Sequence, residues 1–401
     1  MREILVSEPS YVTRFSCVGA ACRDHCCKRW NITIDKATYN KYLKSEIPDI
    51  RKITREEMLL TKKNVQQWAL IKFNEEGNCS FFTEDSLCYI HKVAGPNALS
   101  HTCSSYPRTQ TAYKNEELKS LNLSCPESVR HILFNEQAMN LETTTVLKSN
   151  FNPSSAVNME ARLVNLFCAN LMMQPQYRVE ENLYAIIYFI IFYQKITGSL
   201  EEKIGQMEGA YESIVAQMAS GALTQAMQNV KELQTLELQL LLGLQKHMLE
   251  TEGLRGQDML LDYMIRLNHF FGSDKTEEQL SSGLSQLKKG WDDIALPWLN
   301  QRPYIMRNFF QYRFYHDQFG MKRQQPLLKE IYLIVVDYFF MKSLLSAAAL
   351  EKGHLTDDDL INVMYSYSTV RQHDRKVDDK FSQDIDRFKR NDDLSVLNLL
   401  V

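Results

Sequence analysis

CVGAACRDHCC, residues 17–27, holds four of the nine cysteines of this 401-residue chain. Four more follow within the first 125 residues, at Cys79, Cys88, Cys103 and Cys125. Thiols this close in sequence can converge on one metal centre after a single turn of the chain. Zinc takes four tetrahedral thiolate or imidazole ligands, and an iron–sulfur cluster is usually held by four thiolates. We therefore take all eight cysteines as candidate metal ligands and expect a metal-binding N-terminal part.

The number and kind of metal sites stay open. Eight thiols suffice for two sites, or for one site with spare thiols, and ligand type alone does not separate zinc from iron. The adjacent pair Cys26-Cys27 is unusual, because structural zinc sites place two to four residues between neighbouring ligands. His25, His91 and His101 lie among the thiols, where each either ligates metal or is fixed by hydrogen bonds near it. The ninth cysteine, Cys168, is expected to be a buried apolar side chain.

Composition and hydropathy narrow the class of protein. The apolar run near the N-terminus, residues 4–6, is too short for a secretory signal, which needs 7–15 such residues. The longest candidate for a membrane span, residues 183–193, falls short of the ~20 residues that a spanning helix needs. We expect a cytoplasmic protein without membrane insertion, in which dense cysteines indicate metal ligands before disulfides. A net charge of −3 argues against a general nucleic-acid binder. The oligomeric state is not indicated.

Proline and cysteine usage divides the chain. Five of the ten prolines occur by residue 126, and none lies between Pro175 and Pro297, where long helices can form. We expect a mainly α protein, with a small cysteine-rich metal-binding N-terminal domain containing short β pieces (residues 1–150) and a larger all-helical domain (residues 151–401). The helical domain is expected to bind the substrate or a partner.

Local patterns predict individual elements. Helical spacing of apolar residues recurs at 200–219, 223–250, 326–350 and 356–372. Ser154 or Ser155 is a candidate cap for a further helix through Leu171, and Thr356, followed by three aspartates, marks a helix start. In the N-terminal part we expect helices at 35–47, at 54–70 from a capping-box pattern and from Pro126 onward, with short strands at 79–82 and 87–90.

Several common catalytic motifs are absent. The chain has no G-x-G-x-x-G after a strand, no P-loop, no G-x-S-x-G and no H-E-x-x-H. Any reaction that this protein runs is therefore expected to depend on its metal site.

The cysteine blocks resemble a known family, the bacterial flagellin lysine-N-methylases. The first block carries Cys17, Cys22, Asp24, the Cys26-Cys27 pair and Trp30; the later blocks carry Cys79, Cys88-Tyr89-Ile90-His91, Thr102-Cys103, Tyr106-Pro107-Arg108 and Ser124-Cys125-Pro126-Glu127. The N-terminal part is also similar to a broader group of zinc- or iron-chelating domains with a CC pair and a later C-x-x-Y-P.

This resemblance implies methyl transfer from S-adenosylmethionine to lysine ε-amines of flagellin, with a [4Fe–4S] cluster held by the cysteine set and zinc as the alternative metal. One departure from a related chemistry matters. A radical-S-adenosylmethionine loop has the spacing C-x3-C-x2-C, and after Cys22 and Cys26 the third position here is Arg29. The spacing therefore does not support a radical mechanism.

Lysine methylation predicts roles for particular side chains. The ε-ammonium, with an ordinary pKa near 10.4, must lose a proton before its nitrogen attacks, and a nearby carboxylate or tyrosine can assist. The candidate catalytic residues are Asp24, Tyr106 and Glu127, and Tyr89 is a further polar aromatic group in this part. The candidate cofactor-binding residues are Trp30, whose ring suits a sulfonium, and Arg108, which can bind a carboxylate bidentately. Each has a structural alternative: Trp30 and Tyr106 as core, Asp24 and Glu127 as turn caps, Arg108 as a counter-charge to thiolates.

The sequence is also compatible with two other functions. The runner-up is a non-enzymatic module in which zinc holds the N-terminal domain and the helices bind a partner; a one-electron carrier is a third. Four methionines, Met207, Met218, Met227 and Met248, either line a groove for a partner helix or belong to the core.

Overall fold

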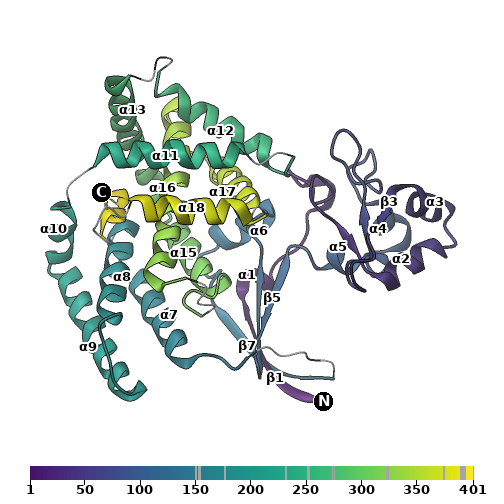
Figure 1. The fold of residues 1–401 in the computed structure, drawn as a ribbon, viewed down its shortest axis with the longest axis horizontal. Coiled ribbons are helices and arrows are strands. Elements are labelled where there is room, and N and C mark those ends of the chain that lie inside the picture. The colour runs from purple at the N-terminus through teal and green to yellow at the C-terminus, as the bar shows by residue number, and fades with distance from the viewer. Residues whose placement is uncertain are drawn as a thin grey trace.

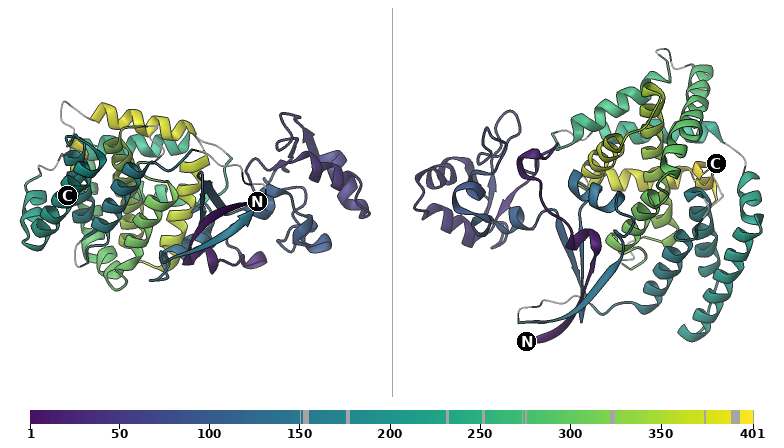
Figure 2. Two further views of the ribbon diagram at one scale, coloured as in Figure 1. Left: turned by 90° about the horizontal axis from the view of Figure 1, so that it is seen from below. Right: turned by 180° about the vertical axis from the view of Figure 1, so that it is seen from behind.

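The computed structural model describes residues 1–149, 151, 155–175, 178–230, 233–250, 253–272, 274, 276–321, 325–373, 375–388 and 394–400. A large helical body carries a smaller lobe on one side, and a β-sheet lies between them (Figure 1). The two views of Figure 2 keep this separation of lobe and body. The expectation of a mainly α protein with a few β pieces is confirmed.

A four-stranded mixed sheet links the lobe to the body. Its order is β5-β6-β1-β7, with the strands β1 (Arg2–Pro9), β5 (Arg108–Ala112), β6 (Glu116–Leu121) and β7 (Leu141–Lys148). The strand β1 runs parallel to β6 and antiparallel to β7, with Ile4 opposite Val146. The chain leaves this sheet after β1, builds the lobe, and returns to it as β5. The eight-residue strands β1 and β7 were not predicted.

The lobe contains a second, three-stranded sheet and four short helices. The strands, in the order β2-β4-β3, are β2 (Thr33–Ile34), β3 (Met58–Leu60) and β4 (Ala69–Ile71). The helices are α2 (Lys36–Leu43), α3 (Pro48–Glu57), α4 (Tyr89–Ala94) and α5 (His101–Ser105), and the 3-10 turn η1 (Gly19–Ala21) precedes them.

Three local predictions can be compared with the lobe. Asp35 caps α2 as expected, accepting a hydrogen bond from the Thr38 amide at 2.8 Å. The helix expected at 54–70 is wrong, because Thr54 lies inside α3 and its hydroxyl donates to the Ile50 carbonyl at 2.6 Å. The strand expected at 87–90 is also wrong: one isolated bridge joins Phe82 to Cys88, and the next residue begins α4.

The body consists of long helices around α16 (Leu327–Lys352). Its other helices are α6 (Pro126–Leu133), α7 (Met159–Met172), α8 (Val179–Tyr193), α9 (Leu200–Ala219), α10 (Ala222–Gln228), α11 (Gln234–Leu249), α12 (Gln257–His269), α13 (Glu277–Gly290), α14 (Leu296–Asn300), α15 (Tyr304–His316), α17 (Asp357–His373) and α18 (Arg375–Phe388). The predictions at 200–219, 326–350, 356–372 and from Pro126 are confirmed. The predicted helix at 223–250 is two helices, α10 and α11.

The start of α7 differs from the prediction. The helix begins at Met159, and the Asn158 side chain caps it by accepting a hydrogen bond from the Ala161 amide at 3.1 Å. Ser155 is therefore not the cap, and Ser154 lies outside the described residues.

Helix α16 is long and apolar enough to cross a membrane, but 89% of its most apolar window is buried inside the protein. It carries Asp337, which is fully buried. The Asp337 carboxylate accepts hydrogen bonds from Arg313 at 2.8 Å, Arg371 at 2.9 Å and Tyr367 at 2.6 Å. Burial by itself would raise the pKa of Asp337, but the two guanidinium groups and the hydroxyl outweigh it and hold that pKa below its usual value. Helix α16 is thus the central helix of the core of the body, and its buried Asp337 is paired with two arginines.

Two hydrophobic clusters fill the interior. One lies in the lobe, on the faces of β2, β4, α2 and α3. The other spans the helices of the body and also includes side chains of β6, α6 and the short helix α1 (Ser10–Thr13). Met207, Met218 and Met248 are buried in this second cluster, so these three are core residues. The division of the chain near residue 150 stays a prediction.

Candidate active site

Two adjoining cavities have walls that together include all eight N-terminal cysteines. The first lies where the lobe meets the body, and the second lies within the lobe. The first thiol cavity has a volume of about 130 Å³ and is lined by the thiol residues Cys17, Cys22, Cys26, Cys27, Cys88 and Cys125. The second thiol cavity has a volume of about 270 Å³ and is lined by Cys17, Cys26, Cys27, Cys79, Cys88 and Cys103. Cys17, Cys26, Cys27 and Cys88 belong to both walls, so the cavities share their central thiols.

Short helices and turns bring these cysteines together. Cys88 and Cys125 precede the first residues of α4 and α6, where backbone N–H groups favour a thiolate. Cys103 lies in α5, whose cap, Ser100, accepts a hydrogen bond from the Cys103 amide at 3.2 Å. The Cys79 amide donates to the Cys27 carbonyl at 2.8 Å, which fixes the second block of sequence against the first.

The central thiols differ in acidity. A hydrogen bond with Cys27 lowers the pKa of Cys26 to about 7, against the opposing effect of burial. A hydrogen bond with Cys27 likewise lowers the pKa of Cys88 to about 6. The same two hydrogen bonds, together with burial, raise the pKa of Cys27 itself. Cys26 and Cys88 are therefore the thiols most readily converted to thiolates at neutral pH.

The outer thiols behave in the opposite way. Burial raises the pKa of Cys22 to about 11, of Cys79 to about 12 and of Cys103 to about 11. Neighbouring buried thiols do not all ionise unless a cation lies beside them, because a cation stabilises the negative charges of several thiolates at once. Among the described residues, no three His, Cys, Asp or Glu side chains meet at a single point suited to one bare ion. Cys27 is hydrogen-bonded to both Cys26 and Cys88, and the other N-terminal thiols line the same two cavities.

The three predicted catalytic residues all line the first thiol cavity. Burial raises the pKa of Asp24, against the lowering effect of the Arg255 guanidinium. The Asp24 Oδ2 atom is buried and has no hydrogen-bond partner among the described residues; Arg255 Nε lies 3.7 Å from it. The Tyr106 hydroxyl lies 3.0 Å from Ser124 Oγ. Glu127 pairs with Arg130 at 3.0 Å and lies 3.3 Å from His131.

The two predicted cofactor-binding residues line the second thiol cavity. Trp30 donates its ring N–H to the Cys26 carbonyl, and its ring centroid lies 5.4 Å from that of Tyr106. Arg108 is exposed, and its guanidinium lies 5.0 Å from the centroid of Phe15. Trp30 is thus held in place by the segment of residues 17–27, which we call the thiol turn. Arg108 lies at the edge of the second thiol cavity.

The remaining candidates are distributed unevenly. His91 lines both cavities and His25 lines the first, whereas His101 lines neither. Tyr89 points elsewhere, because its hydroxyl donates to Asp49 at 3.0 Å on the surface of the lobe. Cys168 is buried in the core of the body, as predicted.

Arg255 is the residue of this site that sequence reasoning missed. It lies just before α12, is 5% exposed, and donates to the Tyr106 hydroxyl and to the Ser124 carbonyl. Its backbone N–H donates to the Arg29 carbonyl at 3.2 Å, so both its side chain and its main chain touch the N-terminal part. The only local signal is the pair of flanking glycines, Gly253 and Gly256, both at positive φ. That signal indicates a turn and says nothing of a contact with thiols more than a hundred residues away.

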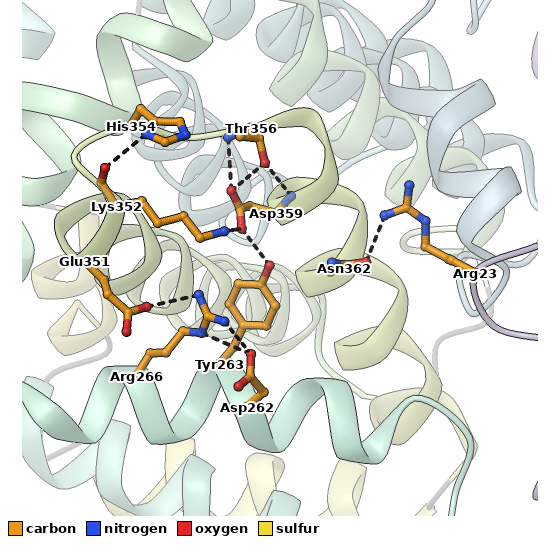
Figure 3. Close-up of polar contacts among 10 residues, drawn as sticks. All are labelled: Arg23, Asp262, Tyr263, Arg266, Glu351, Lys352, His354, Thr356, Asp359 and Asn362. Atoms are coloured by element: carbon orange, nitrogen blue, oxygen red, sulfur yellow. Dashed lines mark hydrogen bonds and ion pairs between the residues drawn. The ribbon is translucent and has the colours of Figure 1, made fainter.

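A second arginine fastens the thiol turn to the body. Arg23 donates to Asn362 at 3.0 Å (Figure 3). It also donates to Asp358 at 2.6 Å, at the beginning of α17. This end of α17 is itself fixed by Asp359, which accepts hydrogen bonds from Tyr263 and Lys352 (Figure 3). The side chain and amide of Thr356 complete a capping box with Asp359, as expected of a helix start. The candidate site is therefore assembled from the lobe and from two helices of the body.

Comparison with known proteins finds relatives that match over the full length of the chain. Residues 165–400 match the model of the FliB lysine N-methylase C-terminal domain. The chain is 35% identical to the lysine-N-methylase of Salmonella typhimurium strain LT2, over 401 residues that cover the whole of both chains. The lysine-N-methylase of Salmonella choleraesuis strain SC-B67 matches equally well, also at 35% over both whole chains.

A third relative matches over part of this chain only. The flagellar biosynthetic protein FliU of Salmonella muenchen is 51% identical over 142 residues, which are 35% of this chain and 84% of FliU. No solved structure matches. The full-length identity and the domain match together show that this chain belongs to the FliB lysine N-methylase family and is a protein lysine methyltransferase.

Proposed function

We propose that this enzyme transfers methyl groups from S-adenosylmethionine to lysine ε-amines of flagellin in the cytoplasm, and that it depends on a [4Fe–4S] cluster held by the N-terminal cysteines. The observation that carries the proposal is the shared wall of the two thiol cavities. All eight cysteines and all three candidate catalytic side chains line one or both of them. The family resemblance of the cysteine blocks, and the names of the full-length relatives, support the same activity.

The donor set supports a cluster over a single zinc ion. Structural zinc sites place two to four residues between neighbouring ligands, a spacing that the adjacent pair Cys26-Cys27 does not have. An iron–sulfur cluster is usually held by four thiolates, and the eight thiols that line the two cavities, Cys22 and Cys26 among them, supply that number. When bound, such a cluster would supply redox-active, Lewis-acidic iron beside the first thiol cavity.

The reaction requires an uncharged amine. A lysine ε-ammonium loses a proton, and the lone pair of its nitrogen then forms a bond to the methyl carbon while the carbon–sulfur bond breaks, leaving S-adenosylhomocysteine. Asp24 is suited to accept the proton, since it lines the first thiol cavity and its Oδ2 atom makes no hydrogen bond among the described residues, with Arg255 Nε 3.7 Å away. The raised pKa of Asp24 brings its basicity closer to that of the amine.

The other side chains orient the reactants. The face of Trp30, beside Tyr106, suits the positive sulfonium. Arg108, at the edge of the second thiol cavity, suits the carboxylate of the methyl donor. Arg255 holds Asp24 and Tyr106 in position from the body and thus acts as a positioning residue.

The test is methyl transfer by anaerobically purified protein. Flagellin and S-adenosylmethionine are added, flagellin mass is followed, and iron and sulfide are measured in the same sample. We expect mass increments of one methyl group on lysines, and iron with sulfide in near-equal amounts. Protein with its cluster intact that adds no methyl group would overturn the proposal. Zinc without iron or sulfide would instead favour the non-enzymatic zinc module.

A further inference from the structure

The strand β7 leaves one side of the mixed sheet open. It lies beside β1 at the end of the sheet order, and no strand of the described residues pairs with its outer side (Figure 1). Its pairing with β1 runs residue by residue from Leu141 to Lys148 without a bulge. Proteins commonly protect such an edge with proline, charged side chains or bulges, because an open edge pairs with other chains. The central residues 143–147, Thr-Thr-Thr-Val-Leu, contain neither proline nor charge.

The hydrogen bonds of the sheet show which backbone groups of β7 point outward. The Leu5 N–H donates to the Asn115 carbonyl at 2.9 Å, on the side of β6. Because backbone groups of successive strand residues point to opposite sides, the even-numbered residues of β1 bond to β7, and their partners there are also even-numbered. The N–H and C=O groups that point to the open side therefore belong to the odd-numbered residues Leu141, Thr143, Thr145 and Leu147.

This edge also carries exposed apolar side chains. Leu141 is 56% exposed and Leu147 is 64% exposed, and both lie on the solvent face of the sheet. Leu5, which lies opposite Thr145 on that face, is 43% exposed. The other face of the sheet is covered, as the full burial of Ile4 shows. The edge thus combines open backbone groups with leucines that remain in water.

The strand β7 is complementary to itself in the antiparallel direction. When two copies of β7 cross at Thr145, this residue meets Thr145 of the second copy, and Thr143 meets Leu147. All these residues have outward backbone groups, so each pair can exchange two N–H···O bonds. Leu147 then lies diagonally across from Leu141 of the second copy, within the reach of long side chains. The crossing at Thr145 therefore satisfies the edge along its whole length and covers the leucines.

The charges at the two ends of β7 agree with this register. Glu142, whose side chain makes no ion pair among the described residues, comes to lie opposite Lys148 of the second copy. Lys148 already pairs with Glu117 at 2.6 Å, so the register matters chiefly because it places no like charges opposite each other. A crossing centred on Glu142 or on Lys148 would place like charges together.

We propose that β7 is a dimer interface, in which a second copy of this chain adds its own β7 antiparallel to the first, about a two-fold axis at Thr145. The two sheets then form one continuous sheet, and the interface uses the same strand of both subunits, as two-fold symmetry requires. A second copy is the occupant that this edge fits, because the outward groups, the leucines and the charges all match under one crossing. The inference does not depend on the proposed function, since no residue of β7 lines the thiol cavities.

The main test closes the edge without touching the pairing of β1 with β7. Thr145→Pro removes an N–H that points outward, so the hydrogen bonds to β1 remain. The matched control is Gln110→Pro on the other edge strand, β5. The Tyr113 N–H donates to the Glu116 carbonyl on the side of β6, so the N–H groups of even-numbered residues in β5 also point outward. Light scattering after size exclusion and sedimentation equilibrium, at about 1–100 µM protein, measure the mass and the dimer Kd.

We expect the wild type and Gln110→Pro to reach twice the mass of one chain as concentration rises. Thr145→Pro should raise the dimer Kd by about tenfold or more, because both symmetric N–H···O bonds at the two-fold axis are lost. Its circular dichroism should match that of the wild type. In hydrogen exchange, residues 141–148 of the wild type should exchange more slowly at high than at low protein concentration.

A second variant keeps the test decisive if Thr145→Pro does not fold. Leu147→Arg places a charge on an exposed position of the same edge, and its control is Leu166→Arg at a similarly exposed position of α7. We expect Leu147→Arg to raise the dimer Kd about threefold or more, and Leu166→Arg to leave it unchanged. A wild type that stays monomeric over the whole range, or a dimer whose Kd neither β7 variant changes, would overturn the proposal.

Discussion

The lobe and the body of this enzyme are stabilised in different ways. The core of the body consists of leucine, isoleucine, phenylalanine and tyrosine side chains from many helices, with α16 buried at its centre. The core of the lobe is small, and Cys79 belongs to it while Cys27, Cys88 and Cys103 pack against it. Small domains bury too little apolar surface to be stable alone and commonly rely on metals or disulfides. The comparison indicates that the body is stabilised by apolar burial, and we expect the lobe to depend on the cluster proposed for its thiols.

The largest effect is expected from a central thiol. Cys26→Ser removes a thiol of the shared wall whose pKa is lowered to about 7, and Cys22→Ser removes its neighbour in the first cavity. We expect each change to abolish cluster binding and methyl transfer while the helical circular dichroism of the body persists. The matched control is Cys168→Ala, in the core of the body, which should keep its iron. Full iron content in both Cys22→Ser and Cys26→Ser would contradict the assignment of these ligands.

The next effect concerns the body alone. Asp337→Ala leaves two buried guanidinium groups without their shared carboxylate, and we expect a loss of about 3–5 kcal/mol in the free energy of unfolding. Urea unfolding followed by circular dichroism measures it, with Asp386→Asn as the exposed control at about 0–1 kcal/mol. Iron content in native buffer should not change. A loss below 1 kcal/mol for Asp337→Ala would show that the body does not depend on this pair.

Asp337 and its two arginine partners also make the stability of the body depend on pH, in a direction that follows from the pKa of Asp337. The folded-state pKa of Asp337 lies below its unfolded value, which is about 3.9 for aspartate. The stabilisation is therefore complete above that unfolded value and is lost as the pH falls through the folded one. We expect the acid side of the stability profile to flatten in Asp337→Ala. An unchanged acid profile would mean that other carboxylates set it.

A smaller effect tests the contact between lobe and body. Arg255→Met removes hydrogen bonds from a buried guanidinium to Tyr106 and Ser124, each worth about 1.5–3 kcal/mol when charged. We expect the cluster absorbance to be lost at lower urea concentration than the helical signal, whereas the two coincide in the wild type. Arg266→Met, which changes an arginine within the body, is the control and should leave them coincident. Coincident transitions in Arg255→Met would mean that Arg255 does not couple the two parts.

The smallest effects come from two helix caps of the same chemistry. Ser199 caps α9 in the body, and Ser100 caps α5 in the lobe. Each Ser→Ala change should cost about 1 kcal/mol. Ser199→Ala should act only on the unfolding of the body, whereas Ser100→Ala should speed iron loss to a chelator, because its cap positions the amide of Cys103. Equal chelation rates in the two variants would remove this difference between the regions.

The sequence predicted the helices of the body better than the elements of the lobe. Apolar spacing at 200–219 and 326–350 fixes long helices, since each turn repeats the same signal over many residues. In the lobe the signals are short and compete. Thr54 fits a cap by pattern, yet it lies inside α3 because Pro48 starts that helix earlier. The strand β7 was missed because its side chains are mostly exposed and give no apolar alternation.

The residues of the candidate site were likewise only partly predictable from the sequence. The eight cysteines were identified because their residue type and density are unusual, and the three carboxylate or tyrosine candidates because they lie within the same blocks. Arg255 and the contact of Arg23 with α17 could not be identified, because they form only after the chain has folded. Contacts between distant segments leave no local pattern in a single sequence.

The place of β1 in the sheet has a consequence for how the chain is made. This strand is synthesised early, yet its neighbours β6 and β7 lie at residues 116–121 and 141–148. The strand must wait unpaired on the ribosome while the whole lobe emerges, since domains fold as units during synthesis. The lobe is thus an insertion between β1 and β5, and its two ends come together only when both strands have joined the same sheet. If metal binds the thiols before β1 and β5 join the sheet, the thiol turn forms first and the body folds last.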